Sequence, residues 1–330
     1  MQNWINSILT SEIRVALPFM THPGIEMIGK SVKEAVSDGE VHYQAIKAVS
    51  EHFDTTACTV IMDLTVEAEA FGATIQLPDN EVPTVLGRLV SDAASIEALQ
   101  VPGLEKGRVP AYLLASKLAA NNFLDKPVFS GCIGPYSLAG RLYDMSEIMV
   151  AIYVEPDSIQ LLLSKCTEFL INYCKALKAS GTQGVIVAEP AAGLLSGEDC
   201  MTYSSFYVKQ IVDAVQDESF TVILHNCGNT GQCTDAMVAT GAHALHFGNA
   251  IDMEQVLEQC PPDVVVMGNL NPVGVFKQGS VDQVKQDTSA LLRTTAGYKN
   301  FVISSGCDLP PYVPEANIRA FLETVAQFNE

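Results

Sequence analysis

Residues 221–227 read Thr-Val-Ile-Leu-His-Asn-Cys and are followed by a Gly-Asn turn signal. The run is apolar and rich in β-branched residues until His225, a pattern typical of a buried β-strand. A turn signal directly after the thiol predicts that the strand ends there. This run is the clearest of a series, and its spacing from its neighbours predicts the architecture.

Eight apolar runs of this kind occur along the 330 residues, and most are followed by a helical pattern. The runs cover residues 13–19, 56–63, 127–133, 184–189, 221–227, 242–248, 264–270 and 301–306. Helices are expected at residues 42–53, 108–122, 156–179, 203–215, 253–259, 281–295 and 314–328. Regular strand–helix alternation indicates parallel strands joined by right-handed crossovers. Eight such units favour an α/β fold of the closed (β/α)8 TIM-barrel type over an open doubly wound sheet.

Two segments fall outside this alternation. The chain before residue 13 is expected to form an N-terminal extension, and residues 71–98 form an excursion after the second strand. Residues 73–77 of that excursion resemble an extra strand that precedes a Pro-Asp-Asn turn. No linker or low-complexity stretch interrupts the sequence, so one domain covering residues 1–330 is predicted.

Three side chains at run ends have the chemistry of a zinc site. His225 and Cys227 are two residues apart, so in a strand they point to the same face. Cys307 follows the eighth run, and in a barrel the ends of parallel strands meet over one opening. Three nitrogen and sulfur ligands with a vacant fourth position are typical of catalytic zinc. The alternative is a core cysteine beside a histidine bonded to backbone, and Cys233 is a rival third ligand.

Two carboxylates end other apolar runs. Glu189 ends the fourth run, beside the predicted metal strand in barrel order, and Asp63 ends the second run. Both are predicted catalytic residues. For Glu189 the candidate roles are a displaceable metal ligand, a base for an incoming thiol or a substrate contact, and the alternative is a salt-bridged rim residue.

Two further polar residues are candidates for cofactor binding. His246 lies at the end of the sixth run, and Asn269 lies in the seventh within Gly-Asn-Leu-Asn-Pro. The alternative for His246 is an ordinary hydrogen-bonded histidine, and the alternative for Asn269 is a turn cap.

Composition excludes several classes of function. The formal net charge of −19 argues against nucleic acid and anionic membranes as partners, since both need clustered Lys and Arg. The nine cysteines are odd in number and lack short framework spacing, which favours a reducing, cytoplasmic location over disulfides. No run approaches the length of a membrane span, and phosphate-binding, dinucleotide-binding and HExxH motifs are absent.

The run-end signatures together resemble the uroporphyrinogen decarboxylase superfamily, and within it the methylcobalamin:thiol methyltransferases. The resemblance is strongest at residues 63–72, 189–196, 225–229, 268–272 and 305–310. The family fold is a (β/α)8 barrel, and its methyltransferases hold zinc through a His-x-Cys pair and a distant Cys. The matching positions here are His225, Cys227 and Cys307. Asn271 departs from the acidic residue common in the family's motif.

The resemblance implies a zinc enzyme that moves a methyl group from methylcobalamin or another corrinoid to a thiol such as coenzyme M or homocysteine. It also implies a corrinoid carrier protein as partner, and a homo-oligomer is possible. Two alternatives remain. One is decarboxylation of a tetrapyrrole, although the N-terminal segment lacks the Arg-rich pattern of that branch beyond Arg14. The other is a non-catalytic component that holds zinc or a corrinoid.

Overall fold

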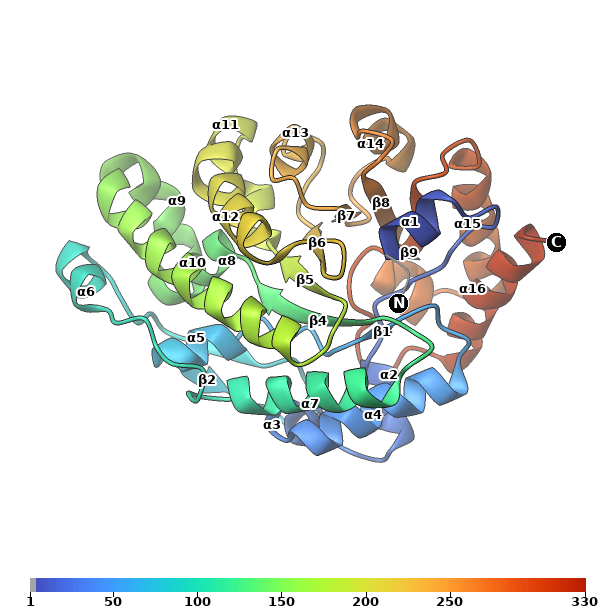
Figure 1. Cartoon of the computed structure of the whole chain (residues 1–330), viewed down its shortest axis with the longest axis horizontal. Coiled ribbons are helices and arrows are strands. Elements are labelled where there is room, and N and C mark those ends of the chain that lie inside the picture. The colour runs from blue at the N-terminus through green and yellow to red at the C-terminus, as the bar shows by residue number, and fades with distance from the viewer. Residues whose placement is uncertain (1–3) are drawn as a thin grey trace.

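The computed structural model describes residues 4–330. Its main sheet has seven parallel strands in the order β1-β4-β5-β6-β7-β8-β9, curled so that the helices lie outside (Figure 1). The strands are β1 (Cys58–Thr59), β4 (Val128–Ile133), β5 (Gly184–Ala188), β6 (Thr221–Asn226), β7 (Ala244–Phe247), β8 (Val265–Leu270) and β9 (Phe301–Ser305). The predicted α/β barrel class is confirmed.

The first predicted run, residues 13–19, differs from the other seven. Ala16 pairs with Ile303 of β9 as an isolated parallel bridge, and the Leu17 N–H donates to the Ile303 carbonyl (2.9 Å). Pro18 has no N–H, so the ladder cannot extend as a regular strand. On the other side, Thr56 Oγ1 donates to the Ala16 carbonyl (2.6 Å). The run therefore lies between β9 and the segment before β1 without being a strand of its own.

Seven helices correspond to the predicted helical patterns. They are α4 (Gly39–His52), α7 (Val109–Asn122), α10 (Pro156–Ala179), α12 (Phe206–Val215), α14 (Met253–Gln259), α15 (Val281–Thr294) and α16 (Glu315–Phe328). The start of the fourth prediction is instead a π-helix, η2 (Met201–Ser205). The remaining helices are α1 (Trp4–Leu9), α2 (His22–Met27), α3 (Val32–Ser37), α5 (Val66–Phe71), α6 (Ala93–Ala98), α8 (Pro135–Tyr143), α9 (Met145–Val154), α11 (Gly197–Cys200), α13 (Thr234–Val238), η1 (Pro190–Leu194) and η3 (Pro272–Lys277).

The excursion after the second run is built around a hairpin. β2 (Thr74–Gln76) pairs antiparallel with β3 (Thr84–Leu86), and α6 follows. The extra strand predicted within residues 73–77 is present, whereas its partner was not predicted. The turn of this hairpin carries Val82 and Pro83, which reach the cavity described below.

Alternate residues of the strands serve two cores. On β6, Val222 and Leu224 pack outward in the large core between sheet and helices, whereas Ile223 packs inside the barrel. His225 and Cys227 continue the inward series. At the opposite end of the barrel, the interior core includes Trp4 of α1, whose ring packs edge-on against Phe129 at 4.9 Å. The N-terminal extension thus closes the bottom of the barrel.

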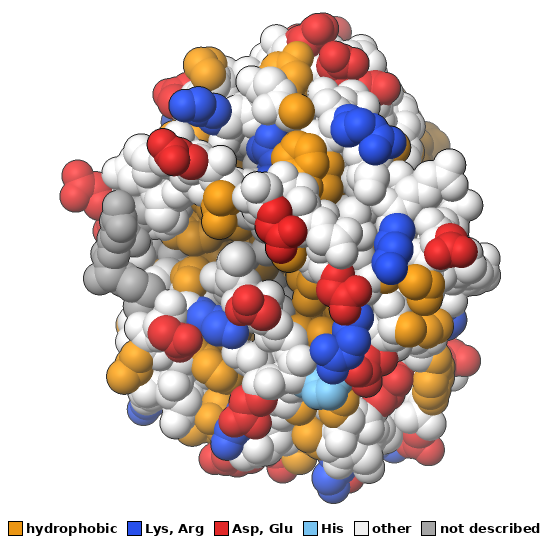
Figure 2. Space-filling model, turned by 90° about the vertical axis from the view of Figure 1, so that its right-hand side faces the viewer, with side chains coloured by type: hydrophobic (Ala, Val, Ile, Leu, Met, Phe, Trp, Pro, Cys, Tyr) orange, Lys and Arg blue, Asp and Glu red, His pale blue; other side chains and the backbone are white. Residues whose placement is uncertain are grey.

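The surface agrees with the acidic composition. In the face shown in Figure 2, acidic and basic side chains are interspersed, with no continuous basic area. Within residues 4–330, none of the helices is long and apolar enough to cross a membrane. All nine cysteines are free thiols.

Candidate active site

The three predicted metal ligands meet at the C-terminal end of the barrel. His225 lies in β6, Cys227 follows that strand, and Cys307 follows β9. One ligand atom from each lies within 4.8 Å of the others, and Cys307 Sγ is 3.6 Å from His225 Nε2. In the described part of the chain, this is the one group of three or more His, Cys, Asp or Glu side chains with such geometry. Residues 82 positions apart are therefore brought to one point.

The loops that present the sulfurs depend on close backbone packing. After β6, the Gly228 N–H donates to Asn226 Oδ1 (3.0 Å), which fixes a tight turn around Cys227. Gly248, after β7, lies against this turn, and a Cβ there would come within 2.5 Å of the Cys227 carbonyl oxygen. Glycine at position 248 is thus required for the position of Cys227.

A hydrogen-bond chain behind His225 fixes its tautomer. Ser304 Oγ donates to the Leu17 carbonyl (2.6 Å), so it accepts from His246 Nε2 (3.0 Å). His246 Nδ1 then has no proton and accepts from His225 Nδ1, 2.7 Å away. The remaining nitrogen, His225 Nε2, is left with a lone pair directed at the two sulfurs. This is the form of imidazole that binds a metal.

The two sulfurs are electrostatically coupled. The hydrogen bond between them lowers the pKa of Cys227 and, with burial, raises the pKa of Cys307 to about 12. Because the two sulfurs lie within 4.8 Å of each other, a thiolate on one opposes deprotonation of the other. A divalent cation between them would remove that opposition, because a bound metal deprotonates its thiol ligands. The donor set thus fits a cation such as zinc.

A cavity of about 240 Å³ opens onto the three ligands. Its wall is mainly apolar, and its polar lining consists of the three ligands, His22, Arg141 and Asp308; the remaining residues are Phe19, Met62, Leu64, Val82, Pro83, Ala188, Pro190, Leu309 and Pro310. Drug-sized ligands occupy pockets of roughly 300–1,000 Å³, so this cavity suits a smaller molecule.

Arg141, His22 and Asp308 were not predicted as site residues. Asp308 is the neighbour of Cys307, and burial raises its pKa well above the ordinary value. His22 Nε2 lies 3.8 Å from Asp308, and burial lowers the pKa of His22 to about 4. Asp308 could have been predicted as a site residue from the sequence, because it directly follows Cys307, a predicted ligand. Arg141 had no such signal, because it lies on α8, beyond the end of β4.

Glu189 and Asp63 are both buried, but neither lines the cavity. The Glu189 carboxylate accepts from the N–H groups of Tyr136 (3.0 Å) and Ser137 (2.6 Å) at the start of α8. Burial raises the pKa of Glu189 to about 7. Its carboxylate lies outside the three-ligand group, so a role as a fourth ligand would require the side chain to leave α8.

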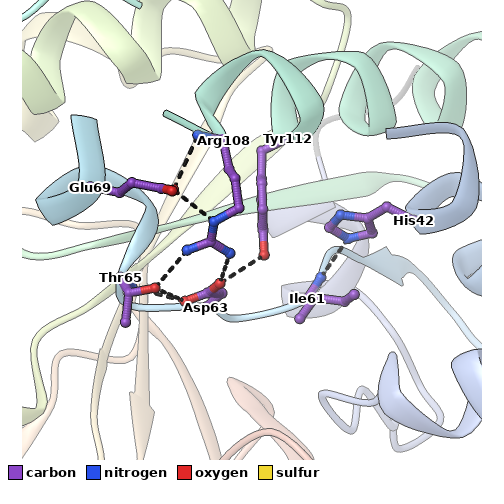
Figure 3. A network of polar contacts seen from close by, with 7 residues as sticks. All are labelled: His42, Ile61, Asp63, Thr65, Glu69, Arg108 and Tyr112. Atoms are coloured by element: carbon purple, nitrogen blue, oxygen red, sulfur yellow. Dashed lines mark hydrogen bonds and ion pairs between the residues drawn. The ribbon is translucent and has the colours of Figure 1, made fainter. Parts of the chain in front are cut away.

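Asp63 belongs to a separate polar network (Figure 3). One of its oxygens forms an ion pair with Arg108, the residue before α7, and the other accepts from Thr65 Oγ1 (2.6 Å). Arg108 Nε also donates to Glu69 (2.7 Å), and Tyr112 Oη lies 3.5 Å from Asp63. The network joins the segment after β1 to α7.

The two predicted cofactor-binding residues also lie outside the cavity lining. His246 is fully buried behind His225 and stacks on Phe19 at 4.2 Å between ring centroids. Asn269 donates from Nδ2 to the carbonyls of Gly248 (2.9 Å) and Ile251 (2.7 Å), and so fastens the loop after β7. Each therefore supports the walls of the site from behind.

The parallel α/β barrel and the His-Cys-Cys group at its C-terminal opening place this protein among barrel proteins with a candidate metal centre. The uroporphyrinogen decarboxylase (URO-D) family model matches residues 13–328, and the chain belongs to this family.

Two curated relatives are methylcobamide:CoM methyltransferases MtbA. The protein from Methanosarcina acetivorans is 28% identical over 317 residues, covering 92% of this chain and 89% of the relative. The protein from Methanosarcina mazei is 27% identical over 308 residues, with the same coverage. A uroporphyrinogen decarboxylase from Serratia proteamaculans is 26% identical, covering 83% of this chain and 79% of the relative. The chain is thus a methyltransferase-like member of the family at modest identity.

Solved structures show the same fold. A methyltransferase from Methanosarcina mazei superposes with a TM-score of 0.90 at 22% identity, covering 98% of this chain and 97% of that one. A B12-independent methionine synthase from Shewanella superposes with a TM-score of 0.59 at 14% identity, covering 95% and 94%.

Proposed function

We propose that this protein is a zinc-dependent enzyme that transfers a methyl group from a methylated corrinoid to a small thiol. The convergence of His225, Cys227 and Cys307 on one cavity is the observation that carries the proposal. The similarity to methylcobamide:CoM methyltransferases supports a corrinoid as donor and makes coenzyme M the first acceptor to test.

The chain's residues fit zinc. Two thiolates and a neutral imidazole would balance its two positive charges, and the His225 tautomer leaves Nε2 free to bind. When bound, zinc would lower the pKa of an incoming thiol, whose ordinary value is about 8.5, and hold it as the more nucleophilic thiolate.

The remaining groups supply position and a dry environment. The apolar wall formed by Phe19, Met62 and Leu64 excludes water around the acceptor sulfur. The sulfur gives an electron pair to the methyl carbon as the carbon–cobalt bond breaks. Cobalt keeps the pair of the broken bond and falls from Co(III) to Co(I), while the thiol proton passes to solvent. The methyl group therefore moves without an added oxidant or reductant.

The donor has to approach from outside the cavity. A volume of about 240 Å³ is below that of pockets for drug-sized ligands, so the cavity is too small to enclose a corrinoid ring. A corrinoid held on a carrier protein and placed over the opening satisfies this limit. We expect such a protein partner, as the similarity to MtbA also suggests.

Tetrapyrrole decarboxylation has less support. Its substrate carries many carboxylates, whereas Arg141 is the one Arg or Lys in the cavity lining among residues 4–330. Arg14, the arginine of the N-terminal segment, donates instead to the backbone carbonyls of Tyr298 (2.9 Å) and Phe301 (2.7 Å). It is therefore engaged away from the cavity.

The test is thiol-dependent demethylation of methylcobalamin, followed by its visible spectrum, with metal content measured on the same samples. We expect about one zinc per chain, and loss of both zinc and activity in Cys307→Ala, with the far-UV spectrum unchanged. Cys260→Ala, which removes a buried thiol outside the site, is the control. Full activity in zinc-free Cys307→Ala would rule the proposal out, as would inactivity of the zinc-loaded protein with every thiol tested.

A further inference from the structure

We propose that the hairpin formed by β2 and β3 is a hinged lid that opens and closes the cavity of the metal site. The hairpin covers residues 74–86, and its turn carries Val82 and Pro83, which line that cavity. Its role in turnover rests on the proposed function, whereas its effect on access to Cys227 and Cys307 does not.

The hairpin is only lightly attached to the rest of the protein. It is separate from the main sheet (Figure 1), and in the described chain β2 and β3 pack chiefly on each other rather than on another helix or strand. Ile75 and Val85, which face the large core, are only half-buried, and their neighbours in the two strands are exposed. A two-stranded hairpin has little stability of its own, and segments with few buried contacts open most readily.

Glycines lie at both ends of the hairpin. Gly72 ends α5 with a φ of 104°, and Gly87 follows β3 with a φ of 66°. A Cβ at either glycine would meet no atom within 4 Å, so neither position is held by packing. Directly beyond Gly87 the chain is fixed again, because the Leu89 N–H donates to the Leu142 carbonyl of α8 (2.8 Å). Unpacked glycines beside fixed backbone are suited to act as hinges.

The tip of the hairpin is seated in the cavity wall. Pro83 is buried, although Val82 and Thr84 on either side of it are exposed, so its ring is inserted into the wall. The Lys33 N–H, in the first turn of α3, holds the tip by donating to the Asp79 carbonyl (3.1 Å). The ion pair between the side chains of these two residues is exposed, with its atoms 3.9 Å apart, and adds little. Withdrawal of the tip would therefore remove part of the cavity wall and break few contacts.

A lid at this position would serve two needs of the proposed reaction. When open, it would widen the path by which a small molecule reaches Cys227 and Cys307. When closed, as in the structure, it would keep water from the reacting sulfur. Changes that weaken the closed position should therefore expose the two thiols to larger reagents.

The test measures access to these two thiols in the metal-free protein. Iodoacetamide is a small reagent and fluorescein maleimide a bulky one, and mass spectrometry quantifies the modified Cys227 and Cys307. Lys33→Pro removes the N–H that holds the tip, at a helix position that tolerates proline, and Lys33→Ala, which keeps the N–H, is the control. We expect fluorescein maleimide to react about 2–10-fold faster in Lys33→Pro, the usual effect of one hydrogen bond, and iodoacetamide to change much less.

A second variant acts on a hinge. Gly87→Ala places a side chain at positive φ, which disfavours the closed position, so we expect fluorescein maleimide to react about 5–30-fold faster. Gly87→Asn should have a smaller effect, because asparagine tolerates this conformation better. Gly241→Ala is the matched control: Gly241 has a φ of 74° and open space for a Cβ, but it lies before β7, at the opposite end of the barrel. If Lys33→Pro does not fold, Gly87→Ala and Gly241→Ala decide the matter.

The outcomes separate the lid from the proposed function. An unchanged maleimide rate in either folded variant overturns the lid, as does an equal acceleration in Gly241→Ala. With zinc bound, a chromophoric chelator should extract the metal faster from Lys33→Pro and Gly87→Ala, and KM for the thiol should rise. Absence of zinc, or of transfer to every thiol, refutes the proposed function, and the alkylation rates still decide whether the hairpin is a lid.

Discussion

His246 controls the candidate metal centre without touching the cavity. Its Nδ1 accepts a hydrogen bond from His225 Nδ1 and so keeps the proton on that nitrogen and Nε2 unprotonated. We predict that His246→Phe, which keeps the stacking on Phe19, weakens zinc binding by about 10–100-fold, the usual effect of losing such a partner. Competition with a chromophoric chelator measures the affinity.

His243→Phe is the matched control, because His243 lies at the start of the same segment and outside the hydrogen-bond chain of His225. Ser304→Ala should have a smaller effect in the same direction, since it removes only the far end of the chain. Unaltered zinc affinity in His246→Phe would show that the tautomer of His225 needs no support.

Glu67 makes the stability of the protein depend on pH. Burial raises the pKa of Glu67 from 4.5 to about 8, although its carboxylate accepts from the Ile133 N–H (3.0 Å). The folded protein thus holds this proton more tightly than the unfolded chain. The resulting stabilisation is complete below pH about 4.5 and is lost as pH rises through about 8.

We therefore predict that this group's contribution to the free energy of unfolding falls steadily between about pH 4.5 and 8, and that the part lost between pH 7 and alkaline pH is about 1.4 kcal/mol, one pKa unit. Glu67→Gln keeps the acceptor for Ile133 and should flatten the profile measured by urea unfolding at several pH values. Glu218→Gln, on the surface, should leave the slope as it is. The same slope in both variants would contradict the assignment to Glu67.

The metal ligands and the two buried carboxylates show how far the sequence predicts the positions of side chains. The metal ligands were predictable because strand periodicity and barrel topology fix which run ends meet. Glu189 and Asp63 end runs in the same way, yet they turn toward α8 and α7, because their hydrogen-bond donors are Tyr136 and Arg108. Run-end position predicts proximity to the opening, whereas partners distant in sequence decide where a carboxylate points.

Among the elements, α7 depends on the ion pair in Figure 3. Arg108 and Asp63 are both nearly inaccessible, so removing one partner leaves a buried charge. We predict that Arg108→Met lowers the free energy of unfolding by about 3–5 kcal/mol, and that adding Asp63→Asn recovers part of this loss. Chemical denaturation of the single and double variants tests the coupling.

Lys209→Met is the comparison, because Lys209 pairs with Asp213 on the exposed face of α12. Its cost should stay below about 1 kcal/mol. Strictly additive effects of Arg108→Met and Asp63→Asn would mean that the network is not a unit.

The bounds of a helix were predicted correctly where its hydrophobic periodicity coincides with residues that start or stop a helix. α10 begins at Pro156 and ends at Ala179 as predicted, because Pro suits the first turn of a helix and a Gly follows the end. The first run was predicted from its apolar content alone. In the structure this run forms only one backbone bridge, from Ala16 to Ile303, and the neighbouring strand β1 has only two residues. On that side the Ala16 carbonyl is bonded by the Thr56 side chain, where a neighbouring strand would use a backbone N–H.

On the scale of the whole molecule, α1 seals one end of the barrel, so everything that enters or leaves the centre uses the other. A carrier protein that covers this opening also blocks it. Under the proposed function, the thiol would therefore enter before the carrier docks, and the methylated product would leave after the carrier departs. We expect compulsory-order kinetics with the thiol first, in which the product thioether inhibits competitively against the thiol and not against the methylcorrinoid protein. Under the proposed function, one opening would serve the thiol, the carrier and the product in turn, so we expect the turnover rate to follow the dissociation rate of the carrier.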